Sequence, residues 1–112
     1  MKLTKDKAIE KEYKRISKLF EGMPENKRQL TEKLIRNCAF MAVTLEELQA
    51  LVNEEGAVVY STNGNGFETR SEHPAQKSYN TMIKNFNATI KQLNDLMPEK
   101  QNVSKLAELI NE

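Results

Sequence analysis

The sequence predicts a mainly α-helical protein. Its main part is a long antiparallel helical hairpin, with an N-terminal basic amphipathic helix, a small β-hairpin excursion and a short C-terminal helix. Apolar residues recur at steps of three and four along three segments, a spacing typical of amphipathic helices. The four glycines and three prolines fall between these segments or at their ends. One short Val-rich run precedes two Asn-Gly pairs, which favours a β-hairpin. At 112 residues, the chain is expected to form a single domain.

The N-terminal segment, residues 1–23, is predicted to contain a basic amphipathic helix over about residues 4–21. One face carries apolar residues at steps of four, three and four: Ile9, Tyr13, Ile16 and Phe20. The opposite face carries a row of cations: Lys7, Lys11, Lys14 and Lys18, flanked by Arg15. At 100° per residue, the four lysines span about 60° of arc. The apolar face is therefore expected to pack on the body of the protein, and the lysines to face solvent.

Two longer helices are predicted over residues 25–55 and 74–97. The first has an apolar stripe with mostly heptad-like steps: Leu30, Leu34, Cys38, Met41, Leu45, Leu48 and Val52. The second has a similar stripe: Tyr79, Ile83, Phe86, Ile90, Leu93 and Met97. Pro74 at the first turn is tolerated because that amide has no intrahelical partner. We expect the two stripes to pair as an antiparallel hairpin, with the all-apolar run 38–43 buried from more than one side.

Residues 56–72 are predicted to form the β-hairpin, with strands at about 57–61 and 67–70 around the Asn-Gly turn. An isolated two-stranded hairpin is only marginally stable in water. We therefore expect this one either to lean on the helices or to pair with another copy of the chain. A fourth, short helix is predicted over residues 102–110, where Asn102 is able to cap its start.

The helices carry more apolar surface than a small monomer can hide, which favours a homo-oligomer. The candidate interface residues are Phe40, Met41, Val43, Tyr79 and Phe86.

Little in the sequence suggests catalysis, so we expect no enzyme, catalytic residue or cofactor. Cys38, the only cysteine, lies on an apolar stripe, which favours a core position over a nucleophile. His73, the only histidine, is expected just outside the start of the last long helix. One cysteine and one histidine cannot supply a Cys/His zinc site, and no metal is expected. The longest apolar run has six residues, against the ~20 needed to span a bilayer. We expect a cytoplasmic protein without a signal peptide.

Charge placement is more informative than net charge, which is only +1. Residues 1–28 hold nine Lys and Arg against five Asp and Glu. A second basic line repeats every seven residues on the last long helix: Lys77, Lys84 and Lys91. On one isolated helix, such lysines most simply keep the surface soluble. In an oligomer, rows from several subunits could together hold the phosphates of double-stranded DNA. The arginines are dispersed, so no base-reading helix is indicated.

Over residues 30–98, the chain resembles the small subunit of phage terminases. The branch in question has a central helix, a Gly-containing excursion and a long helix opened by x-Pro. The matching residues are Leu45, Leu48, Val52, Glu54-Glu55-Gly56, Val58-Val59, Asn65-Gly66, His73-Pro74-Ala75, Leu93, Leu96 and Pro98. The family more often has Asn where this chain has His73. The family also ends the long helix with a Gly-Leu-Thr-Pro type turn and an arginine, where this chain has residues 95–100.

The resemblance implies a non-enzymatic, ring-forming DNA-binding subunit that presents viral DNA to the large packaging ATPase/nuclease subunit. Such a protein would come from a phage or prophage gene and work in the host cytoplasm. The DNA contacts expected from the residues are the two basic rows and Arg15. The alternative is a helical protein–protein interaction module, or a small phage regulator, that does not bind DNA. A prophage remnant with the fold but no retained activity also fits the sequence.

Overall fold

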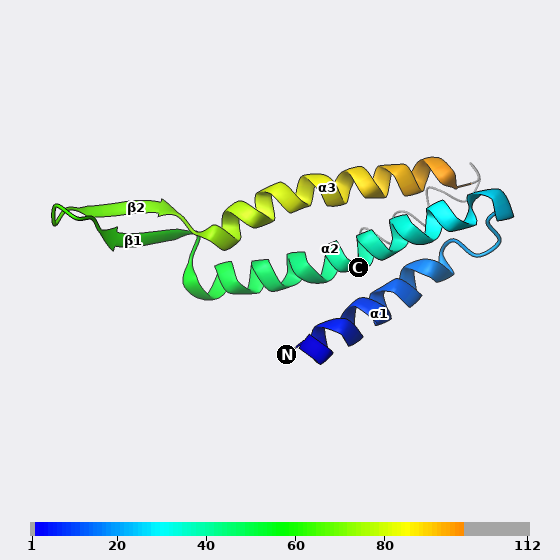
Figure 1. The fold of residues 1–112 in the computed structure, drawn as a ribbon, viewed down its shortest axis with the longest axis horizontal. Helices are drawn as coiled ribbons and strands as arrows, with labels where there is room; N and C mark the ends of the chain where they lie inside the picture. Colours follow the sequence, from blue (N-terminus) through cyan, green and yellow to red (C-terminus); the bar gives the residue numbers. More distant parts are fainter. Residues whose placement is uncertain (1, 98–112) are drawn as a thin grey trace.

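A computed structural model describes residues 2–97 of the chain, as three helices and one two-stranded antiparallel sheet (Figure 1). The helices are α1 (Lys2–Lys18), α2 (Glu25–Glu55) and α3 (Pro74–Leu96). The strands are β1 (Val58–Thr62) and β2 (Glu68–Glu72), which lie between α2 and α3 in the chain. The predicted fold class is confirmed. The predicted helix over residues 102–110 lies outside the described residues.

The long helices α2 and α3 pack antiparallel along their length, as predicted, and α1 packs against α2. All three helices meet at the end of the molecule remote from the sheet (Figure 1). The buried core at that end comprises Ile16, Phe20, Met23, Ile35, Cys38, Ala39, Ile90, Leu93 and Met97. This placement explains why the apolar residues nearer the sheet, where only α2 and α3 run together, are less well covered.

Helix α1 ends at Lys18, three residues before the predicted end. The amides of Leu19 and Phe20 donate to the carbonyls of Ile16 and Ser17, which are three residues back, so the last turn tightens. Phe20 still enters the core, with 6% of its surface exposed. The apolar face predicted for this helix is therefore the face that packs.

The stripe predicted for α2 is wrong at its beginning. Leu30 is 54% exposed, whereas Thr31 and Ile35 are buried. The reason is that α1 covers this part of α2 and selects the face carrying Ile35, which joins the same core as Ile16. The buried hydroxyl of Thr31 donates to the carbonyl of Lys27, 2.8 Å away, and is thereby satisfied.

The end of α2 and the start of α3 are joined through the base of the sheet. Helix α2 ends at Gly56, whose φ of 87° favours glycine and whose amide donates to the carbonyl of Val52 at 2.7 Å. Ala57 lies between Gly56 and β1, and its carbonyl accepts a hydrogen bond of 2.7 Å from the amide of His73. This bond sets the return of the chain into α3.

The sheet pairs Val58 with Glu72 and Thr62 with Glu68, so each strand lies one or two residues later than predicted. The loop is closed by the side chain of Asn63, whose Oδ1 accepts from the amides of Asn65 (2.9 Å) and Phe67 (3.1 Å). The sheet projects beyond the helical pair and touches the helices only at its base (Figure 1). Of the two alternatives expected for this sheet, leaning on the helices is wrong, and pairing with another copy of the chain stays a prediction.

Candidate nucleic-acid interface

The basic row predicted on α1 lies on the solvent face of that helix. Lys7, Lys11, Lys14 and Lys18 are all exposed, while Ile9, Tyr13 and Ile16 on the opposite face contact the core. Within residues 2–97, none of the four lysines makes an ion pair. Their ammonium groups are therefore available to an anionic ligand without the loss of an existing contact inside this part of the chain.

Arg15 is placed differently from these lysines. It is half-buried, and its guanidinium makes two parallel bonds of 2.8 Å to the two carboxylate oxygens of Glu12. A bidentate pair of this kind holds the guanidinium in one orientation. The guanidinium of Arg15 is therefore already engaged with Glu12, unlike the ammonium groups of the four lysines.

Other charges near α1 attach it to α2. Lys5 Nζ lies 2.8 Å from Glu47 Oε1 and 5.0 Å from the centroid of the Phe40 ring. The Arg36 guanidinium lies 3.3 Å from Glu10 Oε2 and stacks over the ring of Tyr13. These contacts use charges on the flank of α1 next to α2, so they fix how the helix lies without using the lysine row.

The competing basic line on α3 is also exposed. Lys77, Lys84 and Lys91 are solvent-facing and make no ion pair within the described part of the chain. They are spread over most of the helix, at seven-residue intervals, whereas the α1 lysines recur every three or four residues. The row on α1 therefore has the higher density of charge.

The candidate interface residues have different surroundings. Val43 is buried within the chain, and Phe86 is half-buried against the core. Met41 and Tyr79 are half-buried, and Phe40 is 46% exposed beneath Lys5. Most of this apolar surface is thus already used in packing within one chain, which leaves Phe40 as the most accessible of the five.

The sequence did not identify several of the exposed apolar side chains. Tyr60 (62% exposed), Phe67 (69%) and Val58 (44%) all lie on the projecting sheet or its loop. Leu51 is 37% exposed on α2, in the stretch beyond the ion pair that attaches the start of α1. The exposure of Val58, Tyr60 and Phe67 depends on the sheet standing away from the helices, a tertiary feature that local sequence patterns do not report.

Cys38 and His73 occupy the structural positions predicted for them. Cys38 is fully buried, and this burial, with the nearby Glu12 carboxylate, raises the pKa of its thiol to about 12, against an ordinary value of 9.0. His73 precedes α3, and its Nδ1 accepts from the amide of Ala75 at 2.9 Å. Its Nε2 lies 2.7 Å from Glu55 Oε1, a partner that local sequence patterns do not indicate.

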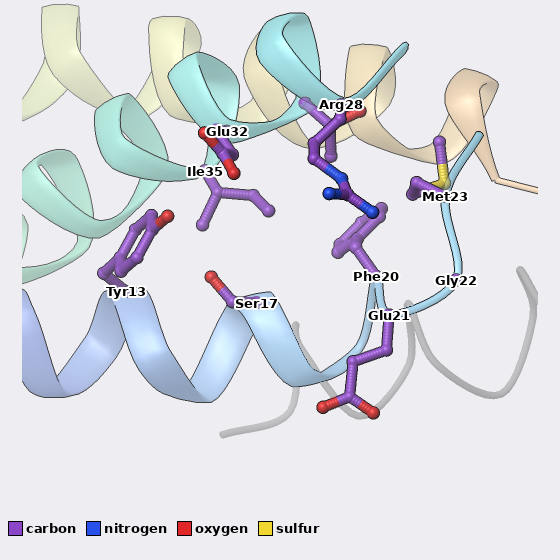
Figure 2. Close-up of a pocket in the computed structure, with 10 residues that line it drawn as sticks. Tyr13, Ser17, Phe20, Glu21, Gly22, Met23, Arg28, Glu32 and Ile35 are labelled. Carbon is purple, nitrogen blue, oxygen red and sulfur yellow. The ribbon is translucent and has the colours of Figure 1, made fainter. Parts of the chain in front are cut away.

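A cavity of about 320 Å³ opens where α1 turns into α2. Tyr13 and Ser17 of α1 face Ile35 and Glu32 of α2 across it, and Glu21 points away from it (Figure 2). Its walls mix aromatic, aliphatic, polar and charged side chains. The described residues hold no cluster of three or more His, Cys, Asp or Glu side chains placed for a metal ion.

Comparisons with protein-family models, with curated proteins and with solved structures find no match to this chain. Among residues 2–97, no helix is both long enough and apolar enough to cross a bilayer. The fold and surface thus define a helical protein with an exposed basic row on one helix and an exposed sheet at the opposite end.

Proposed function

We propose that this chain is a non-enzymatic, homo-oligomeric protein that binds double-stranded DNA through α1. In this proposal it acts as the phage terminase small subunits it resembles, presenting viral DNA to a large packaging subunit in the host cytoplasm. The observation that carries the proposal is the row of Lys7, Lys11, Lys14 and Lys18, which is exposed and unpaired within the described residues.

The strength of the contact depends on how many chains act together. Four lysines on four phosphates correspond to a slope of log affinity on log salt of about −3.6, which is weak binding for one chain. Binding to one duplex through several copies raises the overall affinity because the later contacts become intramolecular. Self-association is therefore part of the proposed function.

The decisive experiment compares two triple variants that change net charge equally. We expect K7E/K11E/K14E to abolish retention of duplex DNA in low salt, because it reverses three of the four charges of the α1 row. We expect K77E/K84E/K91E to retain DNA at close to the wild-type level. Filter retention or a mobility shift, measured over a salt series, gives both the affinity and the slope.

The two variants separate the possible sites. If the α1 variant retained DNA as the wild type does, α1 would not be the DNA-binding helix. Loss in the α3 variant alone would transfer the site to the line of Lys77, Lys84 and Lys91. A wild-type chain that is monomeric by light scattering and binds no DNA in low salt would instead favour the interaction module.

A further inference from the structure

We propose that the exposed edge of β1 pairs antiparallel with β1 of a second copy of this chain, around a two-fold axis at Tyr60. The result would be one four-stranded sheet. This interface joins two copies and so brings two of the lysine rows that the proposed function needs into one assembly, and in that respect the inference rests on the proposed function. The sheet is isolated from the body of the molecule, because it touches the helices only at its base (Figure 1).

A two-stranded sheet standing in water is only marginally stable, and three or more strands are needed for independent stability. Here the exposed residues include Val58 and Tyr60 on β1 and Phe67 in the loop, at 44%, 62% and 69%. Since the helices do not cover this sheet, we expect the further strands that would stabilise it to come from another copy of the chain. The sheet edge offers the backbone groups for that pairing.

The register identifies which backbone groups point outward. The amide of His73 bonds the carbonyl of Ala57, and the amide of Asn63 bonds the carbonyl of Phe67. In an antiparallel pair, bonded and non-bonded positions alternate, so the backbone groups of Val59 and Ser61 also point towards β2. The amides and carbonyls of the alternating residues on β1, namely Val58, Tyr60 and Thr62, therefore point away from β2 along the free edge.

The two edges of the sheet differ in charge. The outward residues of β2 are Glu68, Arg70 and Glu72, all charged and exposed, a composition that discourages strand addition. A second β2 placed antiparallel around Arg70 would set arginine against arginine and Glu68 against Glu72. Like charges directly opposite each other destabilise a sheet. Pairing through β2 is therefore disfavoured.

The β1 edge has the opposite character, because Val58, Tyr60 and Thr62 carry no charge. A two-fold axis at Tyr60 places Tyr60 against its symmetry mate and Val58 against Thr62, with outward amides facing outward carbonyls in every pair. Aromatic and β-branched cross-strand pairs stabilise sheets. The arrangement is also closed, since it joins the two uncharged edges and leaves the two charged edges outermost.

The experiment uses the full chain without nucleic acid, and measures the mass of the assembly by sedimentation or light scattering across protein concentration. Tyr60→Pro removes the central outward amide of β1. Arg70→Pro removes the outward amide directly across the sheet, so it controls for damage by proline to the hairpin while leaving the β1 edge intact. We expect Tyr60→Pro to halve the mass at a concentration where wild type is assembled, and Arg70→Pro to leave it unchanged.

A second variant avoids proline. Tyr60→Glu places a carboxylate opposite Arg70 within the same chain, which supports the hairpin, but sets carboxylate against carboxylate across the two-fold axis. It is expected to halve the mass as Tyr60→Pro does. Hydrogen exchange adds an independent reading: the amides of Val58, Tyr60 and Thr62 should exchange slowly in the assembled wild type, and those of Glu68, Arg70 and Glu72 fast.

A monomeric wild-type chain would overturn this interface, and so would Tyr60 variants that keep the wild-type mass. Equal losses in Tyr60→Pro and Arg70→Pro would also overturn it, since the hairpin as a whole, not the β1 edge, would then be responsible. The proposed function fails separately. A chain that assembles through Tyr60 but does not retain DNA contradicts DNA binding alone, and a DNA-binding oligomer insensitive to Tyr60 contradicts only the β1 interface.

Discussion

His73 joins three parts of the chain through its ring and backbone. Its amide bonds Ala57, its Nδ1 caps the first turn of α3, and its Nε2 reaches Glu55. The two side-chain contacts use the two ring nitrogens, which lie on opposite sides of a rigid ring, whereas the contact to Ala57 uses only the backbone amide. With 7% of its surface exposed, the side chain is a structural link between the end of α2 and the start of α3.

Substitution of His73 separates the cap from the link to Glu55. His73→Ala removes both side-chain bonds and is expected to lower the free energy of unfolding by about 1–2 kcal/mol. His73→Asn keeps an oxygen for the amide of Ala75 but is too short to reach Glu55 in the same way, so it should cost less than alanine. Urea denaturation of the three proteins gives the order. An asparagine variant as unstable as the alanine variant would contradict the capping role.

The buried thiol of Cys38 makes stability depend on alkaline pH. Because its pKa rises from an ordinary 9.0 to about 12 on folding, the folded state holds the thiol proton more tightly than the unfolded state does. Its contribution is fully present below pH 9 and is lost as the pH rises from 9 towards 12. We expect the loss of stability between about pH 8 and about pH 10 to be smaller in Cys38→Ala than in wild type.

Denaturation of both proteins at both pH values gives the comparison directly, because the other titrating groups are common to them. Equal losses would show that the thiol does not carry this pH dependence. A thiol reagent offers a companion measurement. At neutral pH the folded wild type should react far more slowly than the urea-unfolded chain.

At the scale of elements, docking of α1 depends on apolar burial more than on its ion pairs. The Lys5–Glu47 and Arg36–Glu10 pairs are partly exposed, and pairs of that kind contribute about 0–1 kcal/mol. Ile16, by contrast, is completely buried in the core shared by the three helices. Its side chain is therefore the main anchor of the helix that carries the lysine row.

We expect Ile16→Ala to lower the free energy of unfolding by about 2–5 kcal/mol, as large-to-small changes in a packed core do. Ile9→Ala serves as the matched control on the same face, because Ile9 is only half-buried and should cost less. Urea unfolding gives the two values, and hydrogen exchange in α1 shows whether the helix detaches. Similar costs for the two variants would contradict Ile16 as the anchor.

The element boundaries were largely predictable from the sequence. Breakers set them: Pro24 precedes α2, Gly56 ends it, and Pro74 opens α3. The face of α2 was less predictable at its beginning, where Leu30 lies in solvent and Thr31 in the core. Periodicity locates an apolar stripe on a helix. At the start of α2, however, the packing of α1 determines which residues beside that stripe are buried. The position of α1 on α2 does not follow from the sequence pattern of α2 alone.

At the scale of the whole molecule, the chain is elongated. Its extents are 62 × 29 × 23 Å, and its radius of gyration is 18.0 Å, against roughly 13 Å for a compact domain of this length. The length comes from the antiparallel pair of α2 and α3 with the sheet added at one end (Figure 1). The lysine row on α1 was predictable from spacing at 100° per residue, and its exposure agrees with that prediction.

Neither the isolation of the sheet nor the link between His73 and Glu55 was predictable in the same way. Both arise where the chain reverses between α2 and α3, and they depend on the pairing of residues far apart in the sequence. The contrast between the charged edge of β2 and the uncharged edge of β1 is visible in the sequence only once the register of Val58 with Glu72 is known.

The distance between the sheet and α1 has a consequence for how long a ligand must be. Two copies joined at Tyr60 would carry their α1 helices at outlying positions on a span greater than the 62 Å length of one copy. One turn of duplex DNA covers only about 34–36 Å. We therefore expect a fragment of that size to bind to the lysine row of one copy only. Binding to the rows of both copies requires a longer duplex, so the affinity of the dimer should rise once the fragment exceeds a threshold length.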